Sequence, residues 1–166
     1  MSHRFVIEAI MLAVHGRLLT PDDPVEYIIP YTTIEELYEV IDLEEQILSN
    51  HEEDTEVKRK IGDLIAYFEE SFNKKKLERA LMRPWKKSPP ILIGEKVIIT
   101  VIYALENEEF GESFDPIETE LILTAQKEDI PLLTDQIEFL NKIDLHHMHV
   151  YAYDIEEFDH AIEYHN

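Results

Sequence analysis

Acidic side chains are the residues of this sequence whose types and positions could do chemistry. Glu8 ends one apolar run and Asp135 follows another, while Glu36 and Glu118 lie in the first turns of two expected helices. In a parallel sheet, ligands bind beside the carboxyl ends of the strands. Carboxylates that converge there need either protons or a hard cation such as Mg²⁺ or Mn²⁺. Such clusters support metal-assisted phosphodiester hydrolysis.

Each of these acids also has a purely structural explanation. Glu36 and Glu118 could each close a capping box with the polar residue three positions earlier, which satisfies backbone N–H groups at a helix start. Asp135 could cap the short helix that follows it. Glu8 could lie at an exposed strand end. The sequence leaves both explanations open for all four residues.

Basic residues are gathered in one segment of an otherwise acidic chain. The formal net charge is -21, yet ten of the 15 lysines and arginines lie between Lys58 and Lys87. A basic stripe that carries an aromatic side chain can hold a nucleic-acid backbone and stack a base. The alternative is a solvated helix end whose charges favour the helix dipole. The candidate RNA-binding residues are Lys74, Lys75, Lys76, Arg79, Arg83, Trp85, Lys86 and Lys87.

Composition excludes several other classes of protein. The 166 residues include no cysteine, so disulfides, thiolate nucleophiles and cysteine-ligated metals are excluded, and a reducing cytoplasm is the expected location. Four unclustered glycines form no phosphate-binding loop. No apolar stretch reaches the roughly 20 residues that span a bilayer, so we expect no membrane partner.

Histidine offers a second metal site to consider. His147 and His149 would lie on one face of a strand if residues 148–153 and their neighbours are extended, since alternate strand residues share a face. Two imidazoles in that arrangement could share a zinc or nickel ion. Surface histidines at a strand edge are the alternative.

The pattern of apolar residues predicts an α/β fold: a single domain over residues 1–166, with a short, mostly parallel sheet between helices in three layers. Asp115 and Pro116 mark a strong helix start. The apolar segment 91–105 is ambiguous, and we favour a buried helix from about Glu95. The expected strands cover 4–8, 25–30, 130–133 and 148–153, and the other expected helices cover 9–16, 33–48, 56–72, 73–82, 116–127, 135–141 and 155–164.

Several short blocks together resemble the PIN-domain ribonucleases. Arg4–Ala9 (RFVIEA) is similar to the opening strand of that family, and Ile29–Leu37 (IPYTTIEEL) to its second block. The segments ETELILTA (118–125) and PLLTDQIEF (131–139) are similar to the third and fourth blocks. The segments HVYAY (149–153) and IEEF (155–158) look like the last strand and helix. The blocks occur in the family's order over most of the chain.

The resemblance implies that Glu8, Glu36, Glu118 and Asp135, beside Thr134, bind one or two Mg²⁺ or Mn²⁺ ions and cut single-stranded RNA. Three departures from the family's pattern argue against metal binding and catalysis. The opening acid is Glu8 where the family has Asp, Ile10 stands where Asn is usual, and Gln136 replaces a common second acid. The alternative is therefore a catalytically inactive PIN-like binding or regulatory module. Its partner could be RNA, a second copy in a homodimer, or another protein.

Overall fold

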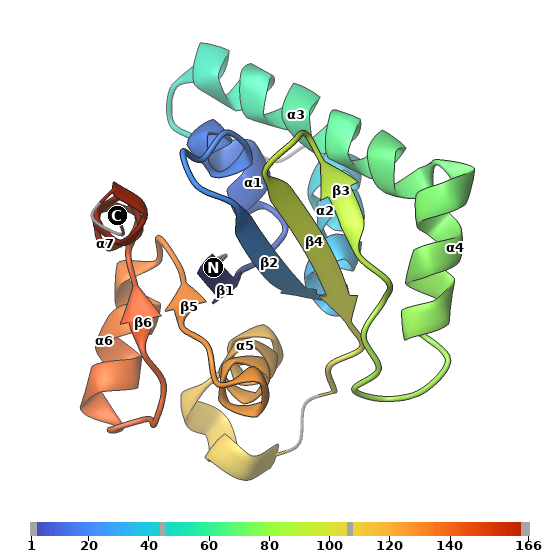
Figure 1. The fold of residues 1–166 in the computed structure, drawn as a ribbon. Helices are drawn as coiled ribbons and strands as arrows, with labels where there is room; N and C mark the ends of the chain where they lie inside the picture. The colour runs from blue at the N-terminus through green and yellow to red at the C-terminus, as the bar shows by residue number, and fades with distance from the viewer. Residues whose placement is uncertain (1–2, 44–45, 106–107, 164–166) are drawn as a thin grey trace.

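The computed structural model describes residues 3–43, 46–105 and 108–163, and it has the predicted α/β architecture. Within these residues six strands form one sheet, and helices cover both of its faces (Figure 1). The strands are β1 (His3–Val6), β2 (Val25–Pro30), β3 (Ile91–Ile93), β4 (Val97–Ile102), β5 (Leu132–Leu133) and β6 (Ala152–Tyr153). The α-helices are α1 (Met11–Val14), α2 (Tyr31–Leu43), α3 (His51–Glu69), α4 (Ser71–Ala80), α5 (Pro116–Glu128), α6 (Ile137–Leu145) and α7 (Ile155–Glu163). Two 3₁₀ helices are η1 (Gly16–Leu19) and η2 (Glu108–Ser113).

The strand order is β3-β4-β2-β1-β5-β6, and only β3 runs antiparallel to its neighbour. The chain moves outward from β1 to β2 and β4, then returns to place β5 on the other side of β1. The order therefore reverses between β1 and β5. In open parallel sheets the crevice at such a switch point, outside the carboxyl ends of the strands, is where ligands bind.

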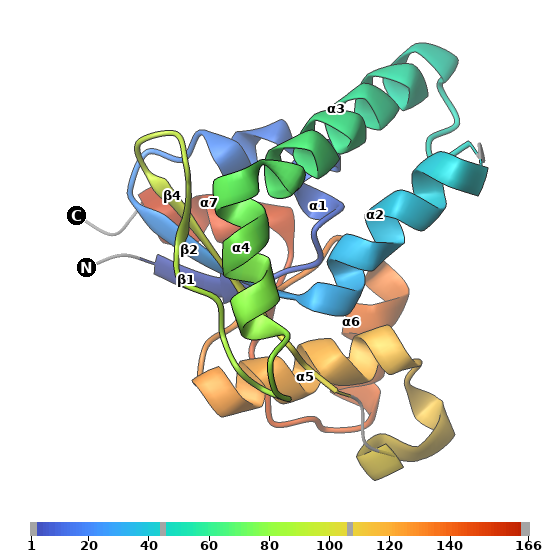
Figure 2. The same cartoon turned by 90° about the vertical axis from the view of Figure 1, so that its right-hand side faces the viewer.

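Alternate strand residues point to two separate cores, as the period of two requires. Phe5, Ile7 and Tyr27 face one core, which α1, α3, α4 and α7 contribute to, while Val6 and Ile28 face the other, beneath α5 and α6. Figure 2 shows α2 and α3 extending past the sheet beyond the end of β2. Along the described residues no helix is both long and apolar enough to cross a membrane.

The prediction of a helix from about Glu95 is wrong, because residues 91–102 form a β-hairpin. Gly94 takes a left-handed conformation with φ 67°, which allows the turn between β3 and β4. Val97–Ile102 pairs with β2 along its whole length and is covered on both faces. A strand buried on both sides gives a continuous apolar run, which sequence periodicity does not distinguish from a buried helix.

The last expected strand, 148–153, is much shorter in the structure. Only Ala152 and Tyr153 pair with β5, and residues 146–150 form a turn and bends in which His147 has φ 50°. His147 and His149 therefore do not share the face of a strand. Among the described residues no three His, Asp or Glu side chains form a group able to hold a metal ion, so the proposed histidine site has no support here.

Candidate functional site

Glu8 lies at the switch point of the sheet, two residues after β1 ends. Its side chain is buried, with 8% exposed, although it carries a carboxyl group. From the β5 side of the crevice, the Gln136 amide Nε2 donates a hydrogen bond to Glu8 Oε1 over 3.1 Å. A buried carboxylate needs such a donor or a positive charge. The explanation of Glu8 as a residue at an exposed strand end is therefore wrong.

Other carboxylates act on Glu8 through their charges. Burial, first, and then the charges of the neighbouring acids together raise the pKa of Glu8 from 4.5 to about 7. These neighbours are Glu36, Asp135, Asp115 and Glu118. The structure thus gathers the four acids selected from the sequence, and adds Asp115 to them. We call these five residues the carboxylate cluster.

Glu36 lies on α2, where it is half-buried. Burial raises its pKa first, followed by the charges of Glu39 and Asp115. The capping box expected with Thr33 does not form. Instead Thr33 Oγ1 donates to the Pro30 carbonyl over 2.9 Å and accepts the Ala9 N–H over 3.1 Å. Thr33 therefore ties the start of α2 to the backbone beside Glu8.

Glu118 forms the capping box expected at the start of α5. The Glu118 N–H donates to Asp115 Oδ1 over 2.7 Å, and the Asp115 N–H donates to Glu118 Oε1 over 2.9 Å. The Lys142 ammonium on α6 also donates to Glu118 Oε1. Glu118 is therefore both a helix cap and a member of an ion pair, and only 7% of it is exposed.

Replacing Asp115 by alanine should lower the free energy of unfolding by about 1 kcal/mol, because the change removes the side-chain half of this box. Urea denaturation followed by circular dichroism measures the effect. Asp22→Ala, an exposed loop substitution, is the matched control. Equal stabilities for the two variants would contradict a capping role for Asp115.

Asp135 does not cap the helix that follows it. The residue before α6 is Gln136, and the helix start has no side-chain capping bond. Asp135 Oδ2 instead lies 2.8 Å from His15 Nε2, which follows α1. The buried Thr134 hydroxyl accepts the Gln136 N–H over 3.2 Å and so fixes the turn after β5. That turn directs the Gln136 amide toward Glu8.

The cluster has the oxygen ligands that a divalent cation needs, but these oxygens already contact other groups and are not placed around one ion. Carboxylate oxygens are the ligands that Mg²⁺ and Mn²⁺ prefer. However, Glu8, Glu118 and Asp135 each already contact a donor of the chain, and in the described ranges no three such side chains are placed to hold an ion together. As arranged, the residues do not fit a resident metal.

None of the three side chains that donate to the cluster was selected from the sequence as a site residue. His15 meets Asp135 across 120 residues, Gln136 meets Glu8 across 128, and Lys142 meets Glu118 across 24. No local spacing signals contacts between residues so far apart in the sequence. Only Gln136 carried a hint, because it stands where an acid was expected.

The basic segment lies beyond β4, on the far side of β2 from Glu8. Lys74, Lys75, Arg79 and Arg83 are exposed there, and no ion pair joins them to an acid of the described chain. The other candidates have contacts of their own. Lys76 Nζ donates to the Pro90 carbonyl over 2.6 Å, Lys86 Nζ lies 3.8 Å from Met82 Sδ, and Lys87 pairs with Glu128 over 2.8 Å.

Trp85, the aromatic residue expected to stack on a base, packs partly against the body of the domain. Its side chain is half-buried against the core beneath α5, and Lys127 Nζ lies 4.8 Å from the ring centroid. Its backbone has φ 66°, and its N–H donates to the Tyr103 carbonyl over 2.7 Å. The exposed aromatic side chain of this region is Phe72, at the start of α4.

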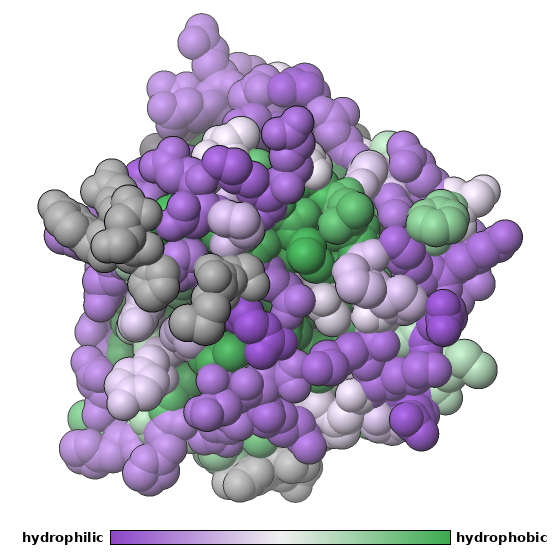
Figure 3. Space-filling model, viewed as in Figure 1, coloured by the Kyte–Doolittle hydropathy of each residue, from purple (hydrophilic) through white to green (hydrophobic). Residues whose placement is uncertain are grey.

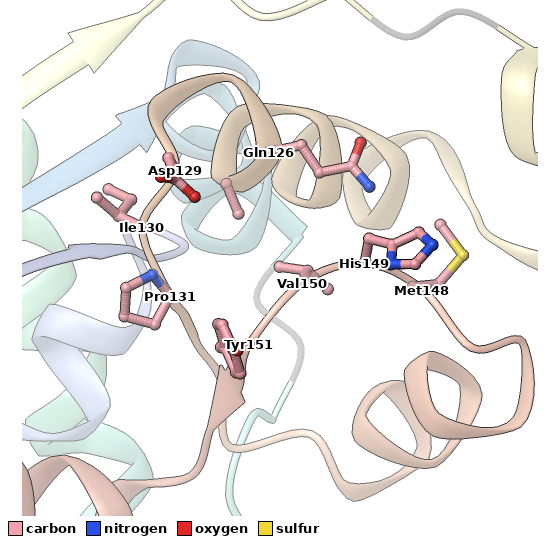
Figure 4. Close-up of a pocket in the computed structure, with 9 residues that line it drawn as sticks. Gln126, Asp129, Ile130, Pro131, Met148, His149, Val150 and Tyr151 are labelled. Atoms are coloured by element: carbon pink, nitrogen blue, oxygen red, sulfur yellow. The ribbon is translucent and has the colours of Figure 1, made fainter.

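A pocket of about 670 Å³ lies away from the cluster, at the opposite ends of the strands, where β5 and β6 begin. Figure 4 shows it between the end of α5 and the segment leading into β6, where Gln126, Asp129 and His149 supply the polar groups. Pro131 and Tyr151, on its other side, directly precede β5 and β6. None of the carboxylate cluster lines this pocket, so its chemistry is separate from that of the switch point.

No family model matches the chain, and no curated protein matches its sequence. The carboxylate cluster therefore stands on its geometry: five acids around the crevice between β1 and β5, three of them in contact with an amide, an ammonium and an imidazole of the same chain.

Proposed function

We propose that this protein is a PIN-like binding module whose carboxylate cluster is balanced by its own donors and does not cut RNA. The observation that carries the proposal is the set of three contacts from Gln136 to Glu8, Lys142 to Glu118 and His15 to Asp135. We place this binding module in the cytoplasm, because a chain without cysteine needs no oxidising compartment.

The physical reason lies in competition for the same oxygens. A divalent cation entering the cluster would compete with the Gln136 amide for the Glu8 carboxylate and would be repelled by the Lys142 ammonium at Glu118 Oε1. Lys142 already supplies positive charge where a cation would supply it, so part of the electrostatic gain of binding is absent. The cluster can therefore be balanced within the fold by the chain's own donors, without a metal.

A second function is supported by a different observation. Glu8 is buried and its pKa is raised to about 7 by burial and by four neighbouring acids, a setting in which a bound cation would stabilise the charged form. In that case Glu8, Glu36, Glu118 and Asp135 would hold Mg²⁺ or Mn²⁺ in a ribonuclease acting on single-stranded RNA. The metal would supply an activated water and screen the phosphate.

Titration with Mn²⁺ by calorimetry separates the two functions. We expect no saturable binding by the EDTA-treated protein in the low millimolar range, and the same weak heats from a Glu118→Ala/Asp135→Ala double variant. End-labelled single-stranded RNA incubated with Mn²⁺ should stay intact. Saturable binding that disappears in the double variant, together with RNA cleavage, would overturn the proposal and establish the ribonuclease.

A further inference from the structure

Helix α4 and the turn that follows it expose two large apolar side chains and several cations on the outside of the molecule. Phe72 is 72% exposed and Met82, just after the helix, is 74% exposed. Lys75 and Arg79 lie between them, one helical turn apart, and Arg83 follows. We call Phe72, Lys75, Arg79, Met82 and Arg83 the α4 face. Figures 1 and 2 both show α4 at the outer side of the fold, with no other element beyond it.

The apolar members of this face are isolated among polar ones. Figure 3 shows separate apolar side chains at the edge of the molecule where α4 lies, and a larger apolar area over β3 and β4. Leu92 on β3 is 60% exposed, and the Lys76 bond to Pro90 holds this strand beside α4. Together with Phe72 and Met82, Leu92 makes three large apolar side chains exposed on this side of the molecule.

The charge of the α4 face is opposite to that of the chain. The protein carries a formal charge of -21, but Lys75, Arg79 and Arg83 make no ion pair with any acid in the ranges the structure describes. Only Glu78 is acidic between Lys74 and Lys87. Electrostatic complementarity selects partners of the opposite sign. The charge of the α4 face therefore favours an acidic partner over a basic one.

The spacing of the anchors indicates what kind of acidic partner fits. Phe72 and Met82 are ten positions apart, one at the start of α4 and the other just after its end, and the ten-residue helix between them is about 15 Å long. An amphipathic helix presents apolar residues at the same spacing, so it can meet both anchors while acids between them meet Lys75 and Arg79. Single-stranded RNA could also use the cations and stack a base on Phe72, so an oligonucleotide serves as the competing probe in the test.

We infer that the α4 face is the docking site for an acidic amphipathic helix of another protein. This inference rests on the proposed function as a binding module. The partner's apolar side chains would pack on Phe72 and Met82, and its carboxylates would pair with Lys75, Arg79 and Arg83. Anchors of this kind contribute most of the affinity of an interface, while the charges on its rim set specificity and association rate.

Nuclear magnetic resonance titration of the ¹⁵N-labelled protein tests the inference. The probes are a synthetic helical peptide with leucines at positions 1, 4, 8 and 11 separated by glutamates, and an oligouridine of twelve nucleotides. We expect the peptide to shift amide signals of residues 71–83. Phe72→Ala and Arg79→Ala should each weaken peptide binding at least tenfold, and the spectra themselves show that the variants stay folded.

Matched controls lie on other surfaces of the protein. Leu145→Ala removes a side chain that is 73% exposed on α6, and Arg17→Ala removes a cation that pairs with Asp159. Both should leave peptide binding unchanged. Peptide shifts outside α4, no peptide shifts, or shifts of α4 by oligouridine alone would each overturn the inference. Because the Mn²⁺ titration uses neither probe, failure of the docking site is distinguishable from failure of the proposed function.

Discussion

Replacing Glu8 by glutamine should remove most of the loss of stability that we expect the wild type to show between pH 5 and pH 8. The folded state holds the Glu8 proton with a pKa of about 7, against 4.5 for an ordinary glutamate. At pH 8 the buried carboxylate is charged among four acids, and this costs about 3 kcal/mol of unfolding free energy. Glutamine is neutral, and its side-chain carbonyl can still accept the Gln136 amide.

The sign follows from proton linkage. An acid whose pKa is raised by folding stabilises the folded state below its unfolded pKa, and this contribution is lost as pH rises through the folded pKa. The wild type should therefore lose stability from about pH 4.5 to above pH 7. The raised pKa of Glu36 acts in the same direction. For this reason the difference between wild type and Glu8→Gln isolates the contribution of Glu8.

Urea unfolding at intervals from pH 5 to pH 8.5 measures this difference. The two proteins should have similar stability at pH 5, and the variant should be more stable by about 2–3 kcal/mol at pH 8. Glu35→Gln changes an exposed glutamate of α2 in the same way and should follow the wild-type curve. Parallel curves for wild type and Glu8→Gln would show that Glu8 is not buried in the cluster.

The sequence was sufficient to predict the α/β class, the start of α5 and the regions that bear the four acids. These features depend on local signals, such as the Asp115-Pro116 start and the apolar runs before Glu8 and Asp135. The β3–β4 hairpin was wrongly predicted as a helix. Its identity depends on burial of Val97–Ile102 on both faces, and that burial is a property of the assembled sheet.

The partners of the acids could not be predicted, because they belong to tertiary structure. Whether Glu118 is a cap or a site residue was left as two alternatives, but Glu118 shares one capping box with Asp115 and one ion pair with Lys142. His15 reaches Asp135 only because β1 and β5 are neighbours in the sheet. Sequence spacing can place an acid at a strand end, while the strand order decides which cation or amide it meets.

Gln136 is the residue on which the balance of the cluster depends most directly. Its side-chain amide donates a hydrogen bond to Glu8 Oε1. Glutamate at position 136 would therefore place a second carboxylate about 3 Å from the first. Two carboxylates at that separation do not both stay ionised without a shared proton or cation. The substitution keeps the length and shape of the side chain and changes only the donor into a charged acceptor.

Gln136→Glu should therefore lower stability at pH 8 by about 2–5 kcal/mol and create a Mn²⁺ site at least tenfold stronger than any in the wild type. Saturating Mn²⁺ should restore most of the lost stability, since an ion bound only by the folded state stabilises it. Calorimetry and urea unfolding with and without Mn²⁺ measure both effects. Gln126→Glu adds the same charge on the exposed side of α5 and should change neither. If the two variants bind Mn²⁺ equally weakly, the Gln136 amide is not what keeps a cation from Glu8.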